Sequence, residues 1–291
     1  MYRTAYKALA LLLFLLLRNS VSIAQSTEPL EPEWLKKDVE GVSEVLKLSS
    51  FENQQIEALK EKLKDTWSVE EQDFGFGGRR LDLGKGNGYT KIYIESFIFN
   101  GQVAYYELGV ESYSEEWSRI RDDVIEAWRK NGNVEYEVSE HRIAYRKTLN
   151  HVLQSYRNAV ASELGEMKSV DVPDELRKSY EYLISFMQNA AVSDGGCGLS
   201  PGFPEGKVAI DELLEHKRYD LIENVLKGHN PGGRVYAMVA LLEKKREGLK
   251  LGVKTQRVIQ KIINLNIPIT TCAGCFAYTE TAKKVVRARR L

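Results

Sequence analysis

Apolar and polar residues alternate with a period of two between residues 89 and 112. Two β-rich runs, 89–99 and 102–112, flank the dipeptide Asn100-Gly101. Both residues of an Asn-Gly pair accept the positive φ angles of a type I′ turn, so the pattern predicts a β-hairpin over 89–112.

The hairpin is expected to have one apolar face and one mixed face. The mixed face carries Tyr93, Phe97, Tyr105, Glu107 and Glu111. Aromatic residues on such a face either form a binding surface or lie under a second layer of helices, and carboxylates indicate contact with water or a partner. The pattern leaves both interpretations open.

Other parts of the first 170 residues favour helices packed on a sheet. Apolar residues at helical spacing predict helices over 49–67, 115–130 and 146–167. A further strand is predicted over 133–138, with a turn at 139–141. The glycine-rich stretch 75–88 leads into a strand rather than a helix, so it is predicted to be a loop with a short strand at 79–83 and not a phosphate-binding loop.

From residue 172 onward the apolar spacing is helical only. Short patterns over 207–217, 219–227, 231–247 and 253–265 are separated by short loops, which is typical of antiparallel helical hairpins. The fold class predicted is therefore α+β, with an antiparallel sheet and helices over 25–170 and an all-α domain over 171–291.

One of these helical patterns resembles a known repeat. The segment 230–241 reads NPGGRVYAMVAL, and the residues that carry the resemblance are Asn230, Pro231, Arg234, Ala237, Ala240 and Leu241. This is similar to a helix of HEAT-type repeats, and the resemblance covers about residues 207–265. It implies paired helices that approach closely at alanines, a scaffold for protein contacts, no catalytic residue, and a structural role for Arg234. At most two repeat units fit, so they are expected to pack against preceding helices.

The amino-terminal residues have the pattern of a secretory signal peptide. Arg3 and Lys7 precede a ten-residue apolar run, which is too short to span a bilayer, and Ser22 and Ala24 fit a small-residue cleavage site. We expect cleavage after residue 24, a periplasmic or secreted location, and no stable membrane span in the mature protein. An uncleaved anchor is the alternative.

The charge balance argues against a nucleic-acid partner. Removal of residues 1–24 leaves 38 of the 41 basic side chains against 41 acidic ones. Duplex binding needs a basic surplus to neutralise phosphates, and only the short tail 283–290 is strongly basic.

The three cysteines allow three kinds of chemistry. In an oxidising compartment Cys197 is predicted to pair with Cys272 or Cys275, closing a loop worth about 4 kcal/mol. Alternatively, Cys272 and Cys275 form a redox pair in front of a helix. A zinc site of the three cysteines with His229 or His216 is the third possibility.

These observations favour an exported protein-interaction or envelope-associated scaffold with an unknown protein partner, no cofactor and no evident catalytic activity. The alternative function is a thiol-disulfide redox protein that uses Cys272 and Cys275. A hydrolase that uses His141 or His151 has no supporting motif, because Ser139, Glu140 and His141 are consecutive and cannot converge from one strand.

Overall fold

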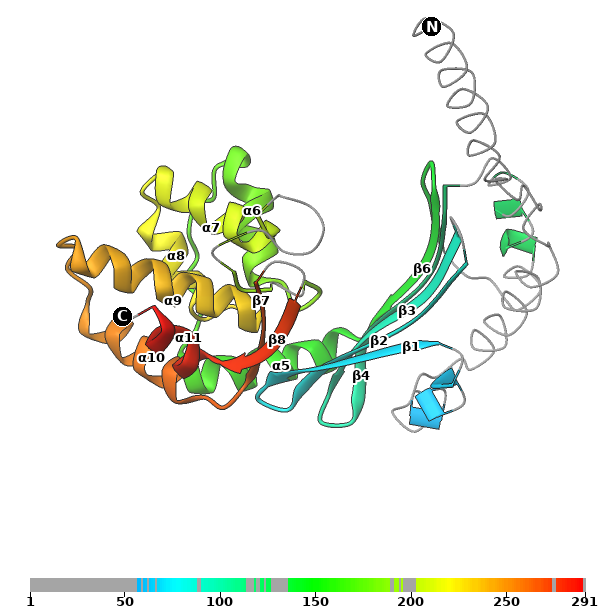
Figure 1. Ribbon diagram of the computed structural model, residues 1–291, viewed down its shortest axis with the longest axis horizontal. Coiled ribbons are helices and arrows are strands. Elements are labelled where there is room, and N and C mark those ends of the chain that lie inside the picture. Colours follow the sequence, from blue (N-terminus) through cyan, green and yellow to red (C-terminus); the bar gives the residue numbers. More distant parts are fainter. Residues whose placement is uncertain are drawn as a thin grey trace, which may run out of the picture. The chain divides into compact units, whose positions relative to one another are not determined.

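Figure 1 shows the computed structural model of the chain. It describes residues 57–289 except 59, 62, 66, 88–89, 114–117, 119–120, 123, 127–135, 189–190, 194, 196–202 and 274–275. The chain divides into two compact units, Met1–Lys47 with Arg119–Gly132, and Leu48–Ser118 with Asn133–Leu291. The second unit holds everything described below. The predicted signal peptide and most of the helices predicted over 49–67 and 115–130 lie outside the described residues.

The amino-terminal part of this unit is an antiparallel sheet, as predicted. Its strands are β1 (Ser68–Gly75), β2 (Gly78–Asn87), β3 (Thr90–Phe99), β4 (Gln102–Ser112), β5 (Tyr136–Val138) and β6 (Arg142–Thr148). They lie in the order β1-β2-β3-β4-β6-β5, and every neighbouring pair is antiparallel (Figure 1).

The hairpin predicted from Asn100-Gly101 is confirmed. Both residues have positive φ angles, 45° at Asn100 and 78° at Gly101. This is the backbone conformation that a two-residue turn between β3 and β4 requires.

Two sequence predictions in this region are wrong. The glycine-rich stretch is not a loop with a short strand, because β1 and β2 form a hairpin through Phe76 and Gly77, and β2 pairs with β3 along its whole length. The helix predicted from residue 146 begins only at Asn150, because β6 continues to Thr148 in register with β4. In both cases the ladder to a neighbouring strand outweighs local propensity.

The remaining helices follow the sequence pattern closely. They are α5 (Asn150–Leu164), α6 (Asp174–Ile184), α7 (Glu205–Glu215), α8 (Tyr219–Val225), α9 (Pro231–Arg246), α10 (Val253–Asn264) and α11 (Ala282–Ala288). None of the described helices is both long enough and apolar enough to cross a membrane.

The prediction that the carboxy-terminal part is purely helical is wrong. Strands β7 (Pro268–Ala273) and β8 (Phe276–Thr281) form a second, two-stranded antiparallel sheet. Val192 adds an isolated parallel bridge to Thr271. The β-branched run Ile269, Thr270 and Thr271 favours this extended conformation.

Helix α9 lies in the middle of the core, and its first eleven residues are all buried. The predicted cap is present, because the Asn230 side chain accepts a hydrogen bond from the Gly233 N–H at 3.2 Å, with Pro231 at the first helical position. Helix α9 approaches α6 closely at Gly233, where a Cβ atom would lie 2.0 Å from the Leu183 carbonyl oxygen. The HEAT-like assignment itself stays a prediction.

Arg234 joins this helix to the sheet. Its side chain is fully buried, and its guanidinium donates to the carbonyl of Gly228 at 3.1 Å and to that of Phe74 in β1 at 2.9 Å. The guanidinium also lies 5.2 Å from the centroid of the Phe76 ring. These contacts support the structural role predicted for Arg234, because they satisfy two carbonyls inside the core.

Part of the mixed face of the β3–β4 hairpin lies under residues of the helical part, which is the second of the two interpretations given above. The Phe97 ring packs on Tyr156 of α5 and on Phe186, with centroids 4.7 and 5.0 Å away. The Tyr105 ring lies 6.1 Å from Phe186. The apolar core therefore reaches Phe97 and Tyr105, and the polar residues of the same face lie beyond it.

Candidate functional site: a polar pocket on the sheet

The register of four strands places three carboxylates in one row across the sheet. Asp82 of β2 lies opposite Glu95 of β3, Glu95 lies opposite Glu107 of β4, and Glu107 lies opposite Arg146 of β6. Directly opposed residues share a face, and like charges in such positions repel each other. The row therefore requires cations from neighbouring positions.

Arg80 provides the cation at one end of the row. Its Nε lies 2.8 Å from Asp82 Oδ2, and its Nη2 lies 3.3 Å from Glu95 Oε2. Its Nη1 donates to the carbonyl of Met187, in the segment that follows α6. The side chain is only 12% exposed, so Arg80 both neutralises two carboxylates and connects the sheet to the helical part.

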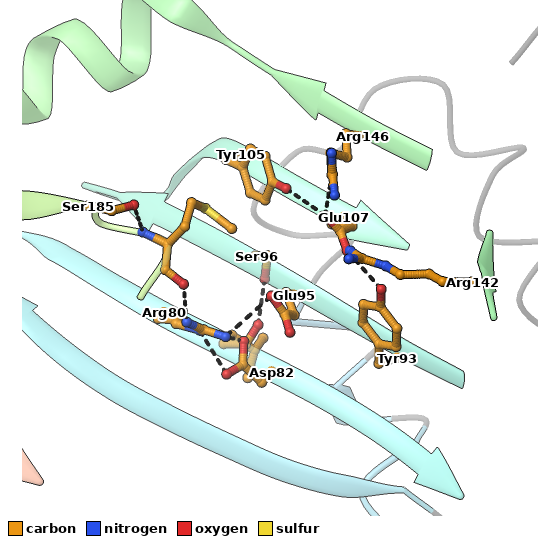
Figure 2. Close-up of polar contacts among 12 residues, drawn as sticks. Arg80, Asp82, Tyr93, Glu95, Ser96, Tyr105, Glu107, Arg142, Arg146 and Ser185 are labelled. Carbon is orange, nitrogen blue, oxygen red and sulfur yellow. Dashed lines mark hydrogen bonds and ion pairs between the residues drawn. The ribbon is translucent and has the colours of Figure 1, made fainter. Parts of the chain in front are cut away.

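Glu107 is the buried centre of the site, with 3% of its surface exposed. The hydroxyls of Tyr93 and Tyr105 donate to its two oxygens at 2.8 and 2.9 Å. Arg142 donates to Oε1 and Arg146 to Oε2, so each oxygen receives one hydroxyl and one guanidinium donor (Figure 2). A buried carboxylate is stable only when it is paired and hydrogen-bonded in this way.

Both tyrosine hydroxyls act as neutral donors. Burial raises the pKa of Tyr93 to about 12, and burial is also the largest cause of the raised pKa of Tyr105. Neither hydroxyl loses its proton near neutral pH, so neither is suited to act as a base.

A glycine gives the Tyr93 ring its place. Gly109 lies opposite Tyr93 in the β3–β4 ladder, and a Cβ atom there would lie 2.2 Å from the Tyr93 Cζ. The ring lies across this glycine, with Lys91 Nζ 5.2 Å and Arg142 Cζ 5.6 Å from its centroid. Gly109 thus allows Tyr93 to reach Glu107.

These residues line a pocket of about 800 Å³. Its basic residues are Arg80, Lys91, Arg142 and Arg146, and its acidic residues are Glu95, Glu107, Glu111 and Glu205. Tyr182 and Met187 contribute from the helical side, together with Gln188. The pocket is therefore rich in hydrogen-bonding groups, and its basic and acidic side chains are equal in number.

Sequence reasoning placed Glu107 on the correct face but gave it the wrong surroundings. It was expected to face water or a partner, whereas two tyrosines and two arginines bury it. The arginines of the site were not singled out. Their signal is the RIAYR pattern of β6, in which Arg142 and Arg146 fall on one face of a strand.

The consecutive residues Ser139, Glu140 and His141 do not form a hydrolase site. The Ser139 hydroxyl donates to the backbone carbonyl of Arg142, and the His141 side chain is 45% exposed, with Nε2 3.8 Å from a Glu140 oxygen. His141 is therefore a partly exposed histidine just before β6.

Cys272, the cysteine that the described residues include, does not stand directly before a helix. Cys272 is on β7 opposite Ala277, whereas Cys197 and Cys275 lie outside the described residues. The residues after the pair were expected to start a helix, but they form β8, and α11 begins only at Ala282. A helix N-terminus that would lower a thiol pKa therefore does not follow the pair directly.

The link predicted between Cys197 and the 272/275 pair stays a prediction, because Cys197 and Cys275 lie outside the described residues. The Val192 N–H donates to the Thr270 carbonyl at 2.8 Å, and the Cys272 N–H donates to the Val192 carbonyl at 3.3 Å. Cys197 is five positions after Val192, and five extended residues span at most roughly 17 Å, a reach that allows the link. We therefore expect non-reducing peptide mapping to find Cys197 linked to Cys272 or Cys275. A Cys272–Cys275 peptide with Cys197 free would contradict the link.

His229, one of the two histidines proposed as zinc ligands, packs against α6 and α5. His229 N–H donates to the Ile184 carbonyl, and its ring lies 5.9 Å from that of Tyr156. No group of three potential ligands gathers within the described residues, and two of the cysteines fall outside them, so the zinc set remains untested.

The buried imidazole of His229 should make the folded protein less stable in acid. Burial, followed by the charges of Arg157 and Arg234, lowers its pKa from 6.5 to about 4. The unfolded chain therefore binds more protons below pH 6.5, and stability decreases as the pH falls from there toward 4. The free energy of unfolding of the wild type should fall between pH 7.5 and pH 5. In His229→Gln this fall should be smaller by about 2 kcal/mol, as measured by urea unfolding at the two pH values. An unchanged difference would contradict the assignment.

Comparison with known proteins does not assign the site to a family. No family model, no curated protein and no solved structure matches this chain.

Proposed function

We propose that this chain is an exported, non-enzymatic binding protein and that the polar pocket is its recognition site. The observation that carries the proposal is the arrangement around Glu107. Four side chains from three strands hold one buried carboxylate, and this network forms the floor of a pocket. Such rigid networks preorganise a surface for recognition.

The chemistry of the pocket supports binding more than catalysis. Its innermost carboxylate is engaged with two guanidiniums, and the tyrosine hydroxyls beside it remain protonated. The most buried carboxylate of the pocket is therefore not free to act as a general base. The scaffold role predicted from the HEAT-like resemblance agrees with this, as does the predicted export of the chain.

A charge reversal at the edge of the pocket tests the proposal. Lys91 is exposed and lines the pocket, whereas Lys250 is exposed in the loop that follows α9. The wild-type mature chain, Lys91→Glu and Lys250→Glu would be immobilised separately and exposed to the solubilised envelope fraction of the source cells.

We expect some envelope components to bind the wild type and Lys250→Glu but not Lys91→Glu. The reason is that Lys91 lines the pocket and Lys250 does not. Thermal melting would verify that all three proteins are folded. Identical sets of retained components on the three proteins would overturn the proposal.

A further inference from the structure

The pocket has a balance of charge that selects for a neutral ligand. Four basic and four acidic side chains line it. A phosphate, nucleotide or sulfated ligand would gain little net attraction there, and a cation would gain no more. Recognition must therefore depend on hydrogen bonds and shape.

The hydrogen-bonding groups are arranged as adjacent donors and acceptors. Arg80 Nη2 lies 3.3 Å from Glu95 Oε2, and the Glu95 side chain is 30% exposed, so a donor and an acceptor within one hydrogen-bond length of each other face the pocket. A hydroxyl group has one donor and two acceptor sites. It can accept from the guanidinium and donate to the carboxylate of the same pair, whereas a carboxylate, phosphate or ammonium ligand can use only one of the two.

The helical side of the pocket provides partly apolar contacts. Tyr182 and Met187 are both half-buried and line the pocket. Burial raises the pKa of Tyr182 to about 12, so its hydroxyl is a further neutral donor. A sugar ring has hydroxyls at its edge and C–H groups on its faces, which matches one polar wall and one wall of mixed character.

The volume is suitable for more than a small fragment. About 800 Å³ is within the usual range for small-molecule sites. Lys91 and Glu205 are both exposed and line the pocket, from the sheet and from the start of α7. They can contact parts of a ligand that extend toward solvent.

We propose that the pocket binds a neutral, polyhydroxylated ligand, a saccharide of more than one ring. This rests on the proposed binding function and names the ligand class of the same site. The Arg80–Glu95 pair and the partly exposed guanidiniums of Arg142 and Arg146 bind its hydroxyls, and Tyr182 and Met187 contact its less polar faces.

Calorimetric titration of the mature chain tests the ligand class. The probes are neutral oligosaccharides, maltotriose and chitotriose among a panel of hexose and N-acetylhexosamine oligomers, with a heparin tetrasaccharide as the anionic probe and tri-alanine as the peptide probe. We expect at least one neutral oligosaccharide to bind, and the anionic and peptide probes not to bind.

Variants at exposed positions connect binding to the pocket without disturbing its buried network. Glu205→Gln and Lys91→Met should each weaken saccharide binding by about tenfold, since each removes a polar contact. Glu243→Gln and Lys250→Met, exposed on α9 and after it, are the matched controls and should leave the affinity unchanged.

Three results would overturn the inference: no neutral saccharide binds at millimolar concentration, binding is equal in all variants, or only the heparin or peptide probe binds. The proposed binding function is judged separately by the envelope experiment. If Lys91-dependent retention persists there while no saccharide binds, the ligand class fails and the binding function stands.

Discussion

Replacing Arg142 and Arg146 together by methionine is expected to lower the free energy of unfolding by about 3 to 5 kcal/mol. Glu107 is almost completely buried, and these two guanidiniums are the cations that contact it. Without them the donors that remain among the described residues are the hydroxyls of Tyr93 and Tyr105, which cannot offset the loss of hydration of a buried charge.

Adding Glu107→Gln to the double variant should recover most of the loss, because the buried charge then disappears. Equilibrium urea unfolding of the double and triple variants measures both effects. Arg177→Met is the control, since Arg177 forms an exposed pair with Asp174, and its removal should leave stability nearly unchanged. A triple variant no more stable than the double one would show that the arginines act through packing rather than through the charge of Glu107.

Gly233→Ala is expected to destabilise the protein by about 3 kcal/mol, although alanine favours helices over glycine by about 1 kcal/mol. The added Cβ would lie 2.0 Å from the Leu183 carbonyl oxygen and 2.9 Å from its carbon. Both atoms belong to the backbone of α6, so the overlap is relieved only by moving one helix away from the other. The steric cost therefore exceeds the gain in helix propensity.

Thermal and urea unfolding of Gly233→Ala would show the effect directly. Gly195→Ala is the control, because a Cβ at Gly195 meets nothing within 4 Å, and a change within about 0.5 kcal/mol is expected. A Gly233→Ala protein as stable as the wild type would show that α6 and α9 can separate without cost.

The sequence by itself determined the elements whose signals are local. Asn100-Gly101 fixed the β3–β4 turn because its two residues accept positive φ angles, and Asn230 with Pro231 fixed the start of α9. The helices from α6 to α10 followed from apolar spacing within single segments. Signals of this kind need no knowledge of distant residues.

Only the tertiary structure decided where the ladders continue and what surrounds the polar face. The glycines of β2 and the segment before α5 became strands because neighbouring strands offered hydrogen bonds, and β7 and β8 formed at the other end of the chain for the same reason. Local propensity depends on residues that are close in sequence, so it cannot predict pairing with a strand that is distant in sequence.

The candidate site depends most strongly on such distant partners. The alternation of β4 predicts the face on which Glu107 lies, but its burial depends on Arg142 and Arg146, which are 35 and 39 residues away. Arg80 reaches the Met187 carbonyl across 107 residues. A carboxylate on a strand is equally compatible with water or with a buried ion pair, and the fold decides between them by bringing the guanidiniums to it.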